Sequence, residues 1–209
     1  MNCEQVDIEP IEVERFQVKE VLKALLHSII FQRALGASQF RDTDSTLFDL
    51  SYVRADSRVI DAKVEDGTDA FGKSLERDET TAAHLVCLSF FERRSRLATG
   101  FSFFRSEEQV VWERWNIPLL VHARDPDLGA QAERAQRSRA LEDTLRDRIE
   151  FVLTMASGKK EHIPPVDGLG SDTPWFDITW ESSSSWASSG LDFFKTFLAS
   201  PPLLSTAQR

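Results

Sequence analysis

The sequence predicts an α+β fold in which helices pack on a mainly antiparallel sheet. Two segments show the three-and-four apolar spacing of amphipathic helices, and several short runs alternate apolar and polar residues as half-buried strands do. The expected order is helix, strand, helix, strand, strand, long helix, strand and short helix. This order lacks the regular strand–helix alternation of a doubly wound sheet.

The composition fits one folded domain. The chain has 209 residues, of which 41% are hydrophobic and 28% are charged, and a chain of this length can share a single core. Pro201 and Pro202 oppose regular structure near the end of the chain. We therefore expect one domain over residues 1–199 and a flexible tail over residues 200–209.

The net charge excludes some classes of partner. At −9, the surface repels the phosphates of nucleic acids and anionic lipids. No apolar run approaches the roughly 20 residues that cross a bilayer, and the acidic N-terminal region does not resemble a signal peptide. We expect a cytoplasmic protein that binds no nucleic acid and does not insert into a membrane.

The first half of the chain contains two helices separated by a strand. Apolar residues recur at helical spacing from Val13 to Gly36, and Gly36 is a natural stop. Residues Thr46–Arg54 alternate as a strand, with Phe48 among the buried positions. Ser57 is placed to cap a second, weaker helix that continues through Phe71.

The second half contains two strands joined by a long connection. Residues His84–Phe91 and Val110–Val121 are rich in strand formers, and Pro118 places the second strand at an edge or at a bend. The intervening segment Glu92–Glu108 is expected to be a polar loop.

A long charged helix, another strand and a short helix complete the order. The long helix runs from about Asp127 to Ala156 and ends at Gly158, because an apolar stripe recurs among its charged residues. Residues Trp175–Trp180 alternate as the last strand, and Leu191–Leu198 form a possible short helix.

No combination of residues indicates catalysis or metal binding. The four histidines are scattered, and His84 with Cys87 lacks the second pair of ligands that a structural zinc site needs. His27, within a run of leucines, is more easily explained as a core-edge or interface residue. The two cysteines, Cys3 and Cys87, are expected to be reduced and unpaired. We expect no catalytic residue, no metal and no cofactor.

Three phenylalanines stand at the centre of the polar connection: Phe101, Phe103 and Phe104. Aromatic rings on a loop cost solvation free energy unless a partner or the body of the protein covers them. The composition is compatible both with cover by a partner and with cover by the body of the protein. The tryptophans at 112, 115, 175 and 180 are better explained by a core than by an interface.

The strand Phe48–Arg54 and the string Trp112-Glu113-Arg114-Trp115 stand in the same order along the chain as two motifs of a known family. They resemble the autophagy-related protein 101 family, whose members have a HORMA domain. The strand resembles the family's Asp-Phe-Thr-Tyr-Val-Arg, and the string resembles its Trp-Glu-x-Trp. The resemblance covers about residues 1–180 and is also carried by Met1-Asn2-Cys3, Leu26-His27, Arg33, Gly36 and Glu161–Pro165.

The resemblance implies a HORMA-like fold and a non-catalytic adaptor. Such an adaptor pairs with the HORMA domain of autophagy-related protein 13 in the kinase complex that initiates autophagy, and acts at the autophagosome assembly site. Family members recruit downstream factors through a Trp-Pro-Phe finger. Counting back from Trp112 places its Phe at Phe104 and its Trp at Ser102, so Phe101 or Phe103 is expected to replace the tryptophan.

The resemblance also implies where the partner HORMA domain binds. Asp42 and Asp44 match an acidic loop that enters the first strand, where carboxylates can pair with basic residues of the partner. His27 and Phe48 complete the expected interface.

Two other functions stay open at this stage. One is a HORMA adaptor of another pathway that captures a peptide with a C-terminal belt, although few residues follow Trp180. The other is a small hydrolase or transferase whose site is assembled from distant carboxylates and His27 or His122.

Overall fold

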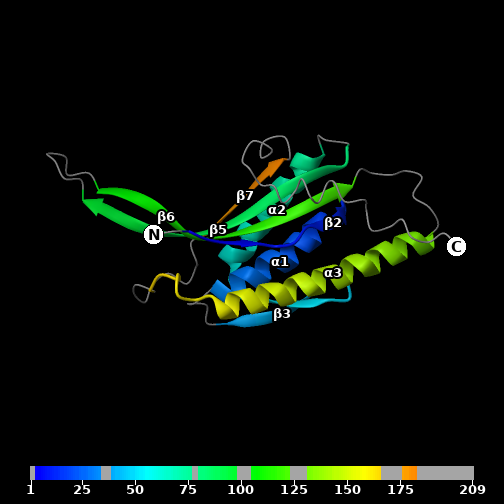
Figure 1. Ribbon diagram of the computed structural model, residues 1–209, viewed down its shortest axis with the longest axis horizontal. Coiled ribbons are helices and arrows are strands. Elements are labelled where there is room, and N and C mark those ends of the chain that lie inside the picture. Colours follow the sequence, from blue (N-terminus) through cyan, green and yellow to red (C-terminus); the bar gives the residue numbers. More distant parts are fainter. Residues whose placement is uncertain are drawn as a thin grey trace.

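The computed structural model describes residues 3–33, 39–76, 80–97, 105–122, 131–165 and 176–182. Within them the fold is mixed α+β, as the sequence predicts (Figure 1). The elements in chain order are β1 (Glu4–Asp7), β2 (Ile11–Glu14), α1 (Val18–Arg33), β3 (Phe40–Asp44), β4 (Ser51–Ala55), α2 (Arg58–Leu75), β5 (Ala82–Leu97), β6 (Arg105–His122), α3 (Gln131–Gly158) and β7 (Phe176–Ser182).

The main sheet has the order β1-β6-β5-β7, and β2 pairs with β6 beyond β1. The longest ladders are antiparallel, between β5 and β6 and between β5 and β7. Both β1 and β2 are parallel to β6, and the sequence analysis missed them. The predicted start of the first helix at Val13 is therefore wrong, because Ile11 and Val13 alternate into the core as a strand and α1 begins at Val18.

The position of β6 corrects the reading of Pro118. This strand lies inside the sheet, not at its edge, with β5 on one side and β1 and β2 on the other. β1 pairs with residues 113–116 and β2 with residues 119–122. Pro118 lies between these two ladders. The backbone N–H that proline lacks is therefore missing from neither the β1 ladder nor the β2 ladder.

The three helices of the described residues pack on one face of the main sheet. α1 is the central helix, because it contacts both α2 and α3 and also β4 of the small β3–β4 sheet. Its leucines and isoleucines are almost completely buried. Ser57 caps α2 as predicted, since its side chain accepts a hydrogen bond from the backbone N–H of Ile60. Gly67 lets α2 approach β7, because a Cβ there would lie 3.0 Å from Ile178.

The core confirms most of the aromatic assignments. Trp115 is fully buried, Trp112 is nearly so, and Trp180 packs against the same core while remaining partly accessible. The predicted strand at Trp175–Trp180 is β7, with Phe176 buried and Ile178 packed on the core. Both cysteines are free, as expected.

Two assignments in the first half of the chain differ from the predictions. β4 begins at Ser51 and not at Thr46, because residues 46–49 form a bend in the connection from β3. Asp42 and Asp44 lie on strand β3 and not in a loop. The helix α3 ends at Gly158 as predicted. The expected short helix at residues 191–198 and the tail at 200–209 lie outside the described residues, so the domain boundary stays a prediction.

Candidate partner-binding surface

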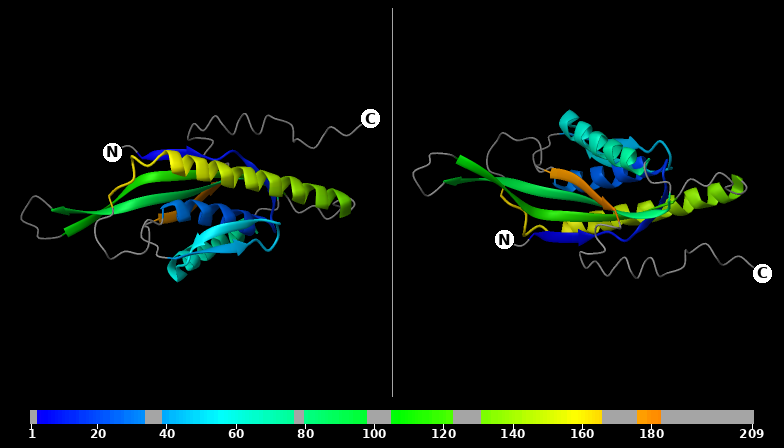
Figure 2. Two further views of the ribbon diagram at one scale, coloured as in Figure 1. Left: turned by 90° about the horizontal axis from the view of Figure 1, so that it is seen from below. Right: turned by 90° about the horizontal axis from the view of Figure 1, so that it is seen from above.

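A two-stranded ribbon, formed by the far ends of β5 and β6, projects beyond the rest of the sheet (Figures 1 and 2). The pairing of β5 with β6 continues to Leu97 opposite Arg105. β7 stops pairing at Phe90, and β1 pairs no further along β6 than Glu113. The prediction of a loop from Glu92 to Glu108 is wrong at both ends, because the strands continue through its charged residues. Phe101, Phe103 and Phe104 lie outside the described residues, between the two ends of this ribbon.

A β-bulge marks the base of the ribbon. Phe90 pairs with Glu113 and Phe91 with Val111, so Trp112 is the extra residue of β6. A bulge bends its strand and increases the local twist. The ring of Trp112 packs on Phe90, with centroids 5.4 Å apart, and on His162, at 5.8 Å. The ribbon therefore leaves the body at a position fixed by aromatic packing.

A buried carboxylate lies next to the bulge. Glu113 is fully buried, and both of its oxygens lie 2.9 Å from Nε of Arg33. The indole Nε1 of Trp115 also donates to Glu113, and Nε2 of His162 lies 2.5 Å from Oε2. We call these four residues the Glu113 cluster. It joins the end of α1, the base of the ribbon and the segment that follows α3.

Arg33 also connects α1 to the end of α3. Its guanidinium donates to the backbone carbonyls of Ala156, at 3.1 Å, and Lys159, at 3.3 Å. Sequence reasoning missed this cluster. The available signal was that Glu113 occupies an inward position of a strand whose neighbouring inward residues, Trp115 and Ile117, are apolar. A buried carboxylate at such a position needs a cation or several donors.

The β3–β4 sheet presents an acidic face. Thr43 pairs with the buried Tyr52, so by alternation Asp42 and Asp44 point away from the core. Both aspartates are exposed, and Asp44 accepts a hydrogen bond from Oγ of Ser51 at 2.7 Å. We call this surface the β3 face. Two exposed apolar side chains lie at the ends of β3: Phe40 at its start and Leu47 in the following turn.

Polar contacts hold the β3–β4 turn against the helices. The carboxylate of Glu20 on α1 accepts from Oγ of Ser45 and from the backbone N–H of Thr46, both at 3.1 Å. On the other side, the N–H of Asp49 donates to Glu142 of α3 at 3.0 Å. The β3 face therefore has a fixed position relative to both α1 and α3.

The structure does not bring His27 and Phe48 to this surface. His27 is 3% exposed and its ring stacks on Tyr52, while Phe48 is 6% exposed within the main core. Burial, followed by the positive charges of Arg54 and Lys23, lowers the pKa of His27 to about 4. Both residues can support the β3 face from beneath, but neither is available for direct contact. Asp42 and Asp44 are the accessible members of the predicted set.

The structure separates His84 from Cys87 and places His122 beside the carboxylate of Glu12. His84 points toward the helices and packs against Phe71, whereas Cys87, three residues further along the strand, points to the opposite side. They cannot share a metal ion. His122 lies 3.3 Å from Glu12, and both side chains remain about a third exposed. Within the part of the chain that the structure describes, no three His, Cys, Asp or Glu side chains are grouped as metal ligands.

None of the described helices combines the length and the apolar character that a membrane-crossing helix requires.

Comparisons with known proteins agree with the sequence motifs. Residues 10–168 match the family described as Autophagy-related protein 101. The chain is 33% identical to Autophagy-related protein 101 of Arabidopsis thaliana over 96% of this chain and 97% of the relative. It is 24% identical to the Rattus norvegicus protein of the same name and 23% identical to that of Homo sapiens, each over 79% of this chain and 77% of the relative. The chain thus belongs to the autophagy-related protein 101 family.

Proposed function

We propose that this autophagy-related protein is a non-catalytic adaptor subunit of the kinase complex that initiates autophagy. In this proposal its fold is HORMA-like, and it binds and stabilises the HORMA domain of autophagy-related protein 13 through the β3 face. It recruits downstream factors through Phe101, Phe103 and Phe104. It acts in the cytoplasm and is brought to the autophagosome assembly site with the other subunits of the complex.

One observation supports recruitment most directly. The ladder between β5 and β6 runs to Leu97 and Arg105, well past the last residues that β1 and β7 pair. The three phenylalanines belong to the seven residues that join these two strand ends. A partner that binds there does not need to approach the helices, so recruitment and HORMA pairing can take place at the same time.

The acidic character of the β3 face supports HORMA pairing. Asp42 and Asp44 point outward, and Asp49 and Asp143 are exposed near the same turn. A surface of this charge favours a partner with basic residues, and rim charges act mainly on the association rate and the orientation. The turn is fixed to α1 and α3, so little conformational order has to be gained on binding.

The recruitment proposal is tested by Phe103→Ala combined with Phe104→Ala in the full chain. We expect the midpoint of thermal unfolding to stay within about 2 °C, because rings that only a partner covers contribute little to the stability of the free chain. Capture of downstream autophagy factors from a cell extract should fall by about tenfold or more, as for a typical pair of aromatic hot-spot residues. Phe16→Ala, which removes an exposed phenylalanine far from the ribbon, is the matched control.

The pairing proposal is tested by co-purification with the HORMA domain of autophagy-related protein 13. Asp42→Lys with Asp44→Lys should slow association, and more so at low ionic strength. The control, Asp66→Lys on α2 with Glu76→Lys at its C-cap, changes the net charge by the same amount at two exposed positions elsewhere. The proposal fails if no complex forms at micromolar concentrations, or if both double variants behave alike.

A further inference from the structure

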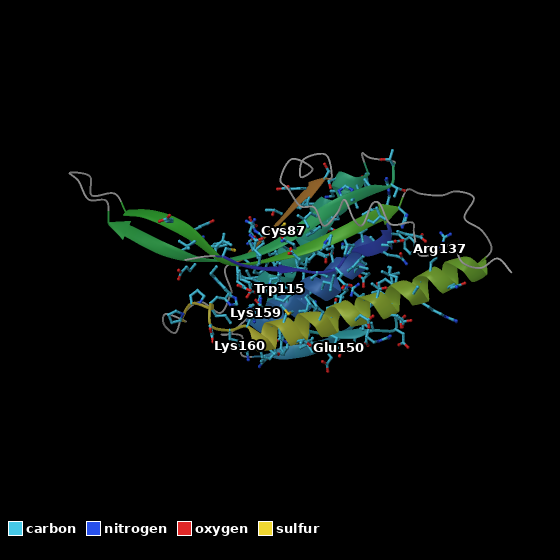
Figure 3. The ribbon with its side chains drawn as sticks, viewed as in Figure 1. Cys87, Trp115, Arg137, Glu150, Lys159 and Lys160 are labelled. Atoms are coloured by element: carbon cyan, nitrogen blue, oxygen red, sulfur yellow. The ribbon has the colours of Figure 1, made fainter. Side chains whose placement is uncertain are left out.

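The main sheet has a second face, opposite the helices, with an apolar strip at its centre. Alternation along β5 directs Val86, Leu88 and Phe90 toward the helices and leaves Ala83, Leu85 and Cys87 on the other side. These three residues form a separate cluster with Leu120 of β6. Figure 3 shows Cys87 and Trp115 on opposite sides of the sheet. We call Ala83, Leu85, Cys87 and Leu120 the outer strip.

The outer strip is bordered by charged strands. Leu85 pairs with Glu181 of β7, and Leu120 pairs with Glu12 of β2. None of the three described helices packs on this side, because their buried residues all belong to the cluster on the other face. Even so, Ala83, Leu85 and Cys87 are each less than a tenth exposed. The strip is apolar, lies between acidic strands and has no described helix over it, so another apolar segment can pack on it.

The chain itself supplies a candidate cover at the right place. The last described strand, β7, ends at Ser182, whose register partner is His84, between Ala83 and Leu85. The last described residue before position 183 therefore lies beside the outer strip. The nine steps from Ser182 to Leu191 can span up to roughly 30 Å, whereas the strip from Ala83 to Cys87 is only about 13 Å long. The length of the segment between Ser182 and Leu191 therefore does not limit docking.

The composition of the segment 191–198 matches an apolar strip. On a helical wheel its apolar residues fall within about half of the circumference, and its polar residues Asp192, Lys195 and Thr196 fall on the other half. The apolar side therefore has no polar interruption. Its members are Leu191, Phe193, Phe194, Phe197 and Leu198.

The other connecting segments are poorer candidates. Residues 123–130, between β6 and α3, contain Leu128 as their only large apolar side chain. Residues 166–175, between α3 and β7, are rich in glycine and aspartate, and their apolar residues do not recur at helical or strand spacing. The segment 191–198 is the one whose apolar side matches the outer strip in size and continuity.

We propose that residues 191–198 dock in cis on the outer strip and close the second face of the sheet. Docking places phenylalanine rings over Leu85 and Cys87, and leaves Asp192 and Lys195 in solvent. The sheet then has a helical layer on one side and the chain's own C-terminal segment on the other. Partners are left with the β3 face and the β5–β6 ribbon.

Cys87 is a natural reporter for this docking. In a full chain with Cys3→Ser, Cys87 is the remaining thiol, and its rate of alkylation by iodoacetamide at pH 8.5 measures access to the outer strip. Phe194→Asp with Phe197→Asp should raise this rate at least tenfold. Leu203→Asp with Leu204→Asp, which adds the same charge to the same tail beyond the segment, should leave the rate unchanged.

A second measurement holds even if the aspartate variant unfolds. Phe194→Cys or Leu204→Cys is placed in the Cys3→Ser chain and treated with a short bis-maleimide. Docking predicts that Cys87 crosslinks in high yield to position 194 and poorly to position 204. Equal yields at the two positions would overturn the proposal. A second result would also overturn it: Cys87 reacts rapidly in the chain whose tail is unaltered, and becomes protected only when a HORMA partner is added.

Discussion

Two carboxylates of this protein, Glu113 and Glu65, are each held by several donors, but in opposite environments. Glu113 is fully buried and bonds to Arg33, Trp115 and His162. The Glu65 side chain is 43% exposed and forms ion pairs with Lys19 and Lys23, each at 2.5 Å. Both sites link helix α1 to another element: β6 in the first case and α2 in the second.

The number of donors that a carboxylate binds therefore does not measure how much that carboxylate contributes to stability. At Glu65, water already solvates the charges, so pairing them adds little free energy. At Glu113, water is excluded, and removing one partner leaves the other charge buried without compensation. The Glu113 cluster therefore makes the relative position of α1, α3 and the ribbon base depend on one ion pair, whereas the α1–α2 contact depends mainly on apolar packing.

The largest expected effect is that of Glu113→Leu. This change leaves the guanidinium of Arg33 buried without its carboxylate, and we expect the free energy of unfolding to fall by about 3–5 kcal/mol. Urea denaturation followed by tryptophan fluorescence measures this loss. If the variant loses less than about 1 kcal/mol, the contrast between the buried and exposed carboxylates is wrong.

A double variant sharpens the same comparison. Arg33→Met with Glu113→Leu removes both charges and keeps most of the side-chain volume. Because a buried ion pair is often no more stabilising than apolar residues of similar size, we expect the double variant to recover most of the loss. A double variant that is as unstable as Glu113→Leu would point to the hydrogen bonds of Arg33 with Ala156 and Lys159 as the main contribution.

His27 is a buried titratable group without an ionic partner. Its Nδ1 has no hydrogen-bond partner, and burial lowers its pKa from 6.5 to about 4. The unfolded chain therefore binds the proton more tightly than the folded chain. The stability that the neutral ring provides is complete above pH 6.5 and is lost as the pH falls toward 4, by about 3 kcal/mol.

His27→Phe tests this dependence, because phenylalanine keeps an aromatic ring beside Tyr52 and does not titrate. The difference in unfolding free energy between wild type and variant should change by about 3 kcal/mol between pH 7 and pH 4, in favour of the variant at low pH. Urea titrations at several pH values measure it. A difference that is independent of pH would mean that the pKa of His27 is the same in the folded and the unfolded chain.

The smallest effect is expected for Glu65→Ala. Hydrogen bonds from Lys19 and Lys23 lower the pKa of Glu65, but the site is at the surface. We expect a loss of at most about 1 kcal/mol, reduced further in 1 M NaCl because salt screens exposed pairs. Thermal unfolding at low and high salt checks this. A loss that persists at high salt would mean that the ion pairs of Glu65, like that of Glu113, are shielded from the solvent.

The candidate site was only partly predictable. The Ser57 cap, the burial of Trp112 and Trp115 and the elements α1, α2 and α3 follow from local patterns in the sequence. β1 and β2 were missed because four-residue strands carry too little periodicity to be recognised alone. His27 and Phe48 were placed at an interface by resemblance, but the packing of β4 on α1 buries both.

The sequence by itself determined the α+β class, the family and the absence of regular strand–helix alternation, because periodicity and motifs are local properties of the chain. The tertiary structure decided what depends on contacts between distant segments. Arg33 meets Glu113 across 80 positions, and the β5–β6 ladder extends beyond its neighbours to form a ribbon. Such pairings depend on which segments lie side by side in the fold. The spacing of residues within one segment does not indicate its neighbours.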